Sequence, residues 1–130
     1  MGKAQTGEFT VPAGVNVWPH EIETAKALAR SGRTLRFIPK SEGQYVTTPD
    51  IVMDGLAWEM KAPKASSVAA IERNVRRACE QSPNVVLDVR RMKGVPAGAL
   101  EREARACARR IGALRRLLLV AKDGAVLDIM

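Results

Sequence analysis

The spacing of hydrophobic residues divides the chain into helical and extended segments. Apolar residues recur at helical spacing from Pro19 to Gly32, which predicts a first helix over about 19–31. A short β-type run covers 34–38, and the polar stretch 41–45 is typical of a loop. The first half of the chain therefore begins as a helix followed by a strand.

The segment 48–61 contains two strand-like runs on either side of Asp54 and Gly55. Asp-Gly between alternating residues favours a two-residue hairpin turn, because a type I′ turn needs positive φ at both central positions. We therefore predict a β-hairpin here.

The second half of the chain repeats the alternation of helix and strand. The pattern predicts, in order, a helix over 66–81, a continuous apolar strand over 85–89, a helix over 97–111, and a hairpin of 117–121 and 126–129 around Asp123-Gly124. Residues 1–16 show no period and are expected to form a linker or a disordered start, which leaves 17–130 as one domain. The predicted fold class is α/β, with a mixed sheet and helices packed on it.

The hairpin register sorts its side chains onto two faces. With Asp54 and Gly55 as the turn residues, Asp50 lies directly opposite Glu59, and Lys61 points the same way. The other face receives an apolar set consisting of Ile51, Met53, Trp58 and Met60. One face is therefore predicted to be core, and the other to gather charges.

Two carboxylates and a lysine on one face of a hairpin suggest a specific chemistry. Opposed carboxylates repel unless a cation lies between them, and oxygen ligands suit a hard divalent ion such as Mg²⁺ or Mn²⁺. Such an ion polarises a phosphoryl oxygen and activates water, and Lys61 could assist. The alternative is an inert cross-strand cluster of ions.

The charge of the chain favours a polyanionic partner. The 21 Lys and Arg residues outnumber the 14 Asp and Glu residues, giving a formal net charge of +7. Only two Trp, one Tyr and two Phe are present, so recognition of a folded RNA by shape is expected rather than a broad stacking platform.

Other classes of protein are disfavoured by simple features. No stretch approaches the roughly 18 apolar residues of a membrane span, and the first residues lack the apolar centre of a signal peptide. The two cysteines, Cys79 and Cys107, have no Cys or His neighbours at metal-ligand spacing, which disfavours a zinc ribbon or a disulfide framework.

The charged hairpin resembles the PD-(D/E)xK nuclease superfamily. The residues that carry this resemblance are Pro49-Asp50 and Glu59-Met60-Lys61. The resemblance implies an αβββαβ core, here with an extra helix and a C-terminal hairpin.

A closer resemblance is to the C-terminal toxin domains of contact-dependent growth inhibition proteins of the tRNA nuclease type. It covers about 19–92 well and is carried by the stretches His20-Glu21-Ile22-Glu23-Thr24-Ala25, Thr48-Pro49-Asp50-Ile51, Trp58-Glu59-Met60-Lys61, Ile71-Glu72-Arg73-Asn74, Gln81 and Val86-Leu87-Asp88.

This resemblance implies roles for individual residues. Asp50 and Glu59 are expected to bind Mg²⁺ or Mn²⁺, with Zn²⁺ as the alternative, and Lys61 is expected to be the catalytic lysine. Glu21 is expected to complete the site, with Glu23 as the alternative. Residues expected to bind substrate are Lys64, Arg73, Arg77 and Gln81. The single histidine, His20, could be an N-cap neighbour or a phosphate contact, and further backbone contacts could come from Arg76, Arg90, Arg91 and Lys93.

Three functions remain open at this point. The first is a monomeric, metal-dependent endoribonuclease toxin that cleaves tRNA. The resemblance implies that it is exported within a larger protein, acts in the target-cell cytoplasm and is neutralised by a cognate immunity protein. The second is a DNA endonuclease of the same fold. The third is a basic nucleic-acid-binding domain without catalytic activity.

Overall fold

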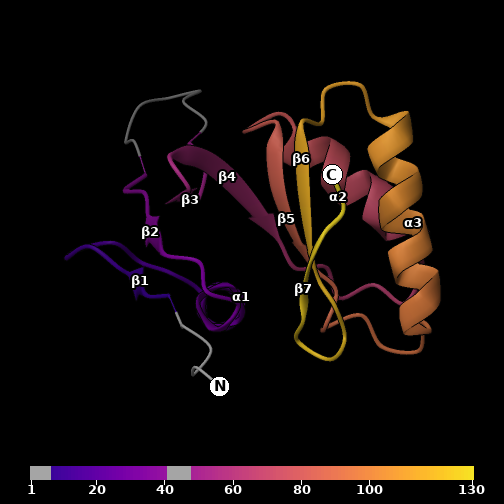
Figure 1. Ribbon diagram of the computed structural model, residues 1–130, viewed down its shortest axis with the longest axis horizontal. Coiled ribbons are helices and arrows are strands. Elements are labelled where there is room, and N and C mark those ends of the chain that lie inside the picture. The colour runs from indigo at the N-terminus through magenta and orange to yellow at the C-terminus, as the bar shows by residue number, and fades with distance from the viewer. Residues whose placement is uncertain (1–6, 41–47) are drawn as a thin grey trace, which may run out of the picture.

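A computed structural model describes residues 7–40 and 48–130 (Figure 1). Its described residues form three helices and one seven-stranded sheet in the order β1-β2-β3-β4-β5-β6-β7. The elements are β1 Phe9–Thr10, α1 Pro19–Arg30, β2 Leu35–Phe37, β3 Ile51–Met53, β4 Leu56–Lys61, α2 Ala69–Ala78, β5 Asn84–Asp88, α3 Ala97–Arg110, β6 Arg116–Val120 and β7 Val126–Asp128. The predicted α/β class with a mixed sheet is confirmed.

Strand direction changes across the sheet. The pairs β2/β3, β3/β4 and β6/β7 are antiparallel, whereas β4/β5, β5/β6 and β1/β2 are parallel. The predicted hairpins therefore form at β3–β4 and at β6–β7. The order α1, β2, β3, β4, α2, β5 is the predicted αβββαβ order, and α3 is the extra helix.

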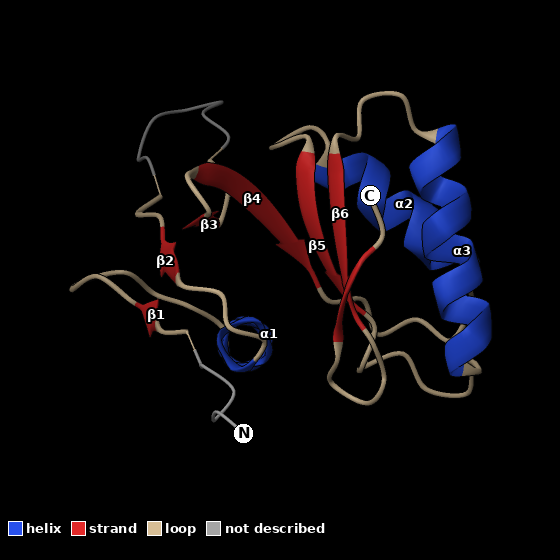
Figure 2. Cartoon of the chain, viewed as in Figure 1, coloured by secondary structure: helices blue, strands red, loops and turns tan. Residues whose placement is uncertain are grey.

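Helices cover both faces of the sheet (Figure 2). The side chains of strand β5 alternate between the two faces, and each face packs in its own hydrophobic cluster, one with α2 and α3 and the other with α1. Val85 and Leu87 pack in the cluster of α2 and α3, and Val86 packs in the cluster of α1. All five residues of β5 are buried, as predicted for a central strand. None of the described helices has the length and apolarity needed to cross a membrane.

The β3–β4 hairpin has the predicted register. Met53 pairs with Leu56, and Ile51 pairs with Trp58. Asp54 has φ 55° and Gly55 has φ 74°, so both turn residues adopt the positive φ that the Asp-Gly sequence predicts.

Two predicted boundaries are corrected by the structure. Residues 7–16 were expected to belong to a linker, but β1 lies there and pairs in parallel with β2. A two-residue strand is too short to show a period, so the sequence pattern misses it.

Helix α2 was expected over 66–81 but is shorter at both ends, and the Ser67 hydroxyl accepts from the Ala69 N–H at 3.3 Å. The predicted loop 41–45 and residues 1–6 lie outside the described residues.

Candidate active site

The ladder of β3 and β4 ends at the pair Ile51 and Trp58, and Asp50 lies just before it, with its backbone N–H donating to the Trp58 carbonyl at 3.0 Å. Glu59 follows Trp58 in β4, on the face of the sheet covered by α2. Glu59 is aligned with Val85, which packs in the cluster of α2 and α3. The predicted apolar set occupies the other face, where all four residues are buried in the cluster of α1: Ile51, Met53, Trp58 and Met60. The charges are segregated as predicted, but Asp50 and Glu59 are only 8 % and 7 % exposed, so the pair is buried rather than open to solvent.

Both carboxylate oxygens of Asp50 accept hydrogen bonds. Oδ2 accepts from the Met60 backbone N–H at 2.8 Å, which ties the side chain to β4. Oδ1 accepts from the Lys40 ammonium at 2.8 Å, and the same ammonium also donates to the Thr48 carbonyl at 3.0 Å. Lys40 was not singled out from the sequence, because it stands in no motif and its approach depends on the path of the chain after β2.

The carboxylate of Glu59 is only partly satisfied. Its Oε2 lies 3.7 Å from Nζ of Lys61, and its Oε1 is buried without a hydrogen-bond partner among the described residues. The pKa of Glu59 is raised to about 7, first by burial and then by the neighbouring Asp50 carboxylate, against smaller lowering contributions from Lys61 and Lys40. A buried, unpaired carboxylate oxygen beside a second carboxylate is stabilised when it binds a proton or a cation.

These donors fit a hard divalent ion. Asp50 and Glu59 offer only carboxylate oxygens, which is the ligand type that Mg²⁺ and Mn²⁺ prefer. Glu59 Oε1 is the oxygen with a free coordination position. Lys61 extends from the same face, with its side chain 28 % exposed, so its ammonium remains accessible to a substrate at the rim of the pair.

Comparison with known families gives an independent result. The family described as the contact-dependent growth inhibition CdiA C-terminal domain matches residues 47–126. This chain belongs to that family. The matched range includes Asp50, Glu59 and Lys61 and reaches β7, whereas α1 lies before it. No curated protein matches the chain.

A solved structure supports the CdiA C-terminal domain fold over almost the whole chain. It is a chain of the "CdiA-CT/CdiI toxin and immunity complex from Burkholderia pseudomallei". The TM-score is 0.65 at 19 % sequence identity, and the match covers 92 % of this chain and 97 % of that chain. At this identity the likeness shows the fold.

The structure does not bring Glu21 to the carboxylate pair of this CdiA C-terminal domain. Glu21 Oε1 accepts from the Trp18 backbone N–H at 2.8 Å and so caps the start of α1. Helix α1 packs on the apolar face of the hairpin, across the sheet from Asp50 and Glu59. The alternative, Glu23, is exposed and forms an ion pair with Lys26 at 3.2 Å.

The four predicted substrate-binding residues occupy the surface around the α2 side of the sheet. Arg73 and Arg77 are exposed on α2, Lys64 is exposed between β4 and α2, and Gln81 is half-buried just beyond the end of α2. Helix α2 covers the face that carries Asp50 and Glu59. A role for these residues in substrate binding stays a prediction.

A second cluster of acidic residues and a thiol lies between α2 and α3. Glu72, Glu103 and Cys107 come close enough to share a metal ion. Arg110 already donates to Glu72 at 2.7 Å and to Glu103 at 2.6 Å. Burial, together with the Glu103 charge, raises the pKa of Cys107 to about 11, which keeps its thiol neutral. This cluster is therefore a link between two helices, with Arg110 as its cation.

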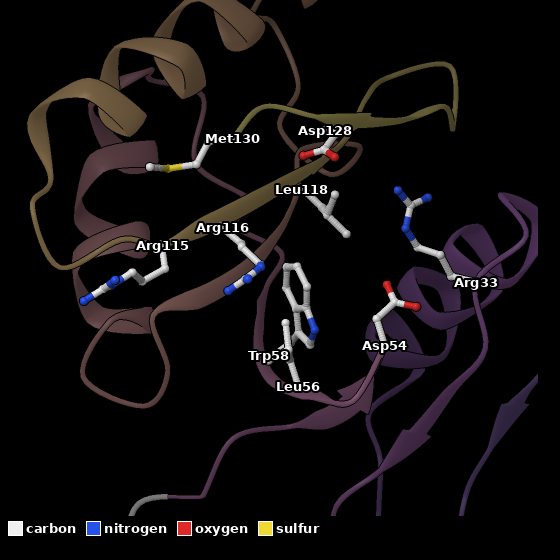
Figure 3. A pocket seen from close by; sticks show the side chains of 9 residues that line it. All are labelled: Arg33, Asp54, Leu56, Trp58, Arg115, Arg116, Leu118, Asp128 and Met130. Atoms are coloured by element: carbon white, nitrogen blue, oxygen red, sulfur yellow. The ribbon is translucent and has the colours of Figure 1, made fainter.

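A cavity of 560 Å³ opens on the opposite face from the carboxylate pair (Figure 3). Its lining residues are Arg33, Asp54, Leu56, Trp58, Arg115, Arg116, Leu118, Asp128 and Met130. The Trp58 indole lies among these side chains and donates from Nε1 to the Met53 carbonyl at 2.9 Å. Neither carboxylate of the pair lines this cavity, so the hairpin chemistry is separate from it.

Proposed function

We propose that this domain is the toxin of a contact-dependent growth inhibition protein and that it cleaves RNA, most specifically tRNA, by metal-dependent hydrolysis of a phosphodiester. The observation that carries the proposal is the buried Asp50–Glu59 pair, with an unpartnered Glu59 oxygen beside Lys61. Membership in the CdiA C-terminal domain family and the fold it shares with a toxin chain support the toxin role.

The site residues have two kinds of role in this proposal. Asp50 and Glu59 would hold Mg²⁺ or Mn²⁺, which when bound would polarise a phosphoryl oxygen and activate water. The hydrogen bond from Met60 N–H to Asp50 fixes the orientation of that carboxylate. Lys61 donates to the phosphate and stabilises the negative charge that develops on it.

The remaining surface is suited to a large polyanion. The net charge of +7 favours association with nucleic acid, and Arg73 and Arg77 on α2 provide cations on the face of the carboxylate pair. Such contacts read the backbone and position the substrate without reading its sequence. The scarcity of aromatic residues favours a folded RNA over a stacked single strand.

Membership in the CdiA C-terminal domain family supports a biological setting for this domain. We propose that the domain is exported as part of a larger protein and acts as a monomer in the cytoplasm of the target cell. The similar chain comes from a complex of a toxin with an immunity protein, which supports a cognate immunity protein as the partner of this domain.

The testing experiment incubates the purified chain with total bacterial tRNA and with plasmid DNA, in Mg²⁺, Mn²⁺, Zn²⁺ or EDTA. Variants Lys61→Met and Glu59→Gln are compared with Lys26→Met, which removes an exposed lysine on α1. We expect tRNA cleavage with Mg²⁺ or Mn²⁺, unchanged in Lys26→Met and reduced by roughly 100-fold or more in the two site variants.

Other results would reject parts of the proposal. Cleavage of plasmid DNA in preference to tRNA would indicate a DNA endonuclease. Cleavage that persists in EDTA would remove the metal from the mechanism. Tight binding of tRNA without turnover in any metal would leave a binding domain.

A further inference from the structure

A second polar cavity lies where β5 ends, on the α1 side of the sheet. It has a volume of 240 Å³ and is lined by residues from the first turns of α1, the last residue of β5 and the segment that follows it, namely His20, Glu23, Asp88, Arg90 and Arg91. The carboxyl ends of parallel strands are a frequent place for ligands in α/β folds, because loops and helix starts converge there.

The charge of Arg90 is fully balanced inside the protein. Its Nε and Nη2 donate to the two oxygens of Asp88 at 3.0 and 2.7 Å, and its backbone N–H donates to Oδ1 at 3.1 Å. Nη2 also donates to the Glu23 carbonyl at 2.9 Å. The Thr24 hydroxyl adds a hydrogen bond to Asp88 at 2.7 Å. Arg90 and Asp88 therefore build the wall of the cavity and bring no net charge to it.

Positive charge in the cavity comes from the other residues. Glu23 lines the cavity, but its carboxylate forms an ion pair with Lys26 at 3.2 Å, so its charge is balanced as well. Arg91 Nη1 is buried and has no hydrogen-bond partner among the described residues. A buried guanidinium N–H without an acceptor destabilises the folded state. A ligand that accepts a hydrogen bond from this nitrogen would remove that cost.

His20 lines the cavity beside Arg91 and offers ring N–H groups as further donors. Burial and the charge of Arg91 are the largest causes that lower its pKa, and Lys64 lowers it further, against opposing contributions from Glu21 and Asp88. An anion in the cavity would offset the charge of Arg91, which opposes protonation of His20, and would supply the missing acceptor.

We propose that this cavity binds a phosphate group through Arg91 and His20, and that the phosphate is one of the RNA backbone next to the scissile bond. The second half of this statement rests on the proposed function. Lys61 is aligned with Leu87, which directly precedes Asp88, so the cavity and the catalytic lysine lie at the same end of neighbouring strands. A guanidinium matches phosphate geometry, and the small volume suits a phosphate rather than a whole nucleotide.

The first test uses the fact that His20 is the single histidine of the chain, so its ring C–H signals in a proton NMR spectrum need no assignment. Inorganic phosphate is titrated at constant pH into wild type, Arg91→Gln, Arg91→Lys and the control Arg109→Gln, which changes an exposed arginine on α3. We expect saturable shifts in wild type and control, at least tenfold weaker binding in Arg91→Gln, and an intermediate affinity in Arg91→Lys. Absence of a saturable shift in wild type, or equal affinity in Arg91→Gln, would overturn the proposal.

The second test asks whether this phosphate site contributes to RNA binding. Binding of total tRNA is measured against salt concentration in a Lys61→Met background, which separates binding from turnover. Adding Arg91→Gln should weaken binding about tenfold and reduce the salt slope by about one ion. Phosphate binding with unchanged tRNA affinity would overturn the assignment to RNA. The two proposals can also fail separately. If the wild-type protein cleaves no tRNA but its tRNA binding still depends on Arg91, the phosphate site is upheld and the nuclease proposal is rejected.

Discussion

The ammonium group of Lys40 lies 2.8 Å from Oδ1 of Asp50. The lysine side chain is 55 % exposed, whereas that of Asp50 is 10 % exposed, so a largely solvated cation neutralises a buried carboxylate. The lysine therefore supplies positive charge to the Asp50–Glu59 pair. A divalent ion held by the pair would supply the same charge, so we expect Lys40 and the ion to compete for Asp50.

Replacing Lys40 by methionine should tighten metal binding. An ion pair with one exposed partner contributes roughly 1 kcal/mol at most, which corresponds to about a fivefold lower Kd for Mn²⁺. Calorimetric titration of Mn²⁺ measures this directly. Lys26→Met, which breaks the exposed pair with Glu23, is the control and should leave the Kd unchanged. Weaker metal binding in Lys40→Met would show that the lysine supports the site and does not compete.

Removal of the Asp50 side chain should destabilise the fold as well as the site. Asp50→Ala leaves the buried N–H of Met60 without an acceptor, at a cost of roughly 1–3 kcal/mol in the free energy of unfolding. Asp50→Asn keeps an oxygen for this hydrogen bond and should lose less. Urea denaturation in EDTA compares the two variants. Equal stability of Asp50→Ala and wild type would mean that water replaces the carboxylate.

Glu59 should make the metal-free protein less stable as the pH rises. Its pKa is about 7 in the folded state, above the ordinary value of 4.5, so the folded state binds the proton more tightly. The resulting stabilisation is complete below pH 4.5 and is lost as the pH rises through about 7. Glu59→Gln, which is neutral throughout, should therefore exceed wild type at pH 8.5 by on the order of 1–3 kcal/mol and approach it at pH 5.

Urea denaturation at the two pH values in EDTA measures this difference. The exposed Glu23→Gln is the control and should show no such trend. A Glu59→Gln variant that is less stable than wild type at pH 8.5 would show that the ionised carboxylate is stabilised by its neighbours. Addition of Mn²⁺ should raise the stability of wild type at pH 8.5 and leave Glu59→Gln nearly unchanged, because the ion binds the charged carboxylate.

Thr24 should stabilise the wall of the second cavity through Asp88. Burial alone would raise the pKa of Asp88, but hydrogen bonds from Arg90 and Thr24 outweigh burial and lower it. Thr24→Val keeps the shape and removes the 2.7 Å hydrogen bond, at a cost of roughly 1.5–3 kcal/mol at pH 7. Since a lowered pKa stabilises the fold above the ordinary value and loses that contribution in acid, the difference from wild type should shrink toward pH 3.

Thr24→Ser is the matched control, because it retains the hydroxyl and should stay within about 1 kcal/mol of wild type. Guanidinium denaturation at pH 7 and pH 3 distinguishes the variants. Equal stability of Thr24→Val and wild type at pH 7 would show that the hydrogen bond to Asp88 does not stabilise the fold.

Local pattern was sufficient to predict the hairpin and its two faces. Asp54 and Gly55 specify a turn with positive φ, and a period of two then places Ile51 and Trp58 in the core and Glu59 on the other face. The first helix was predicted to within about one residue of its observed end, because its apolar spacing and the following Gly32 are local signals. The CdiA C-terminal domain family likewise could be anticipated, since its residues stand in short contiguous stretches.

Tertiary structure alone decided how these faces are surrounded. Whether Asp50 and Glu59 are buried depends on α2 covering their face, and the position of Glu21 depends on α1 packing on the other face. The same holds for Lys40 and for the cavity of His20 and Arg91, whose members come from distant segments. The pattern of hydrophobic and polar residues predicts the type of a single helix or strand and the turn that follows it. Burial and long-range contacts depend instead on how elements pack, a property of the whole chain that no local window contains.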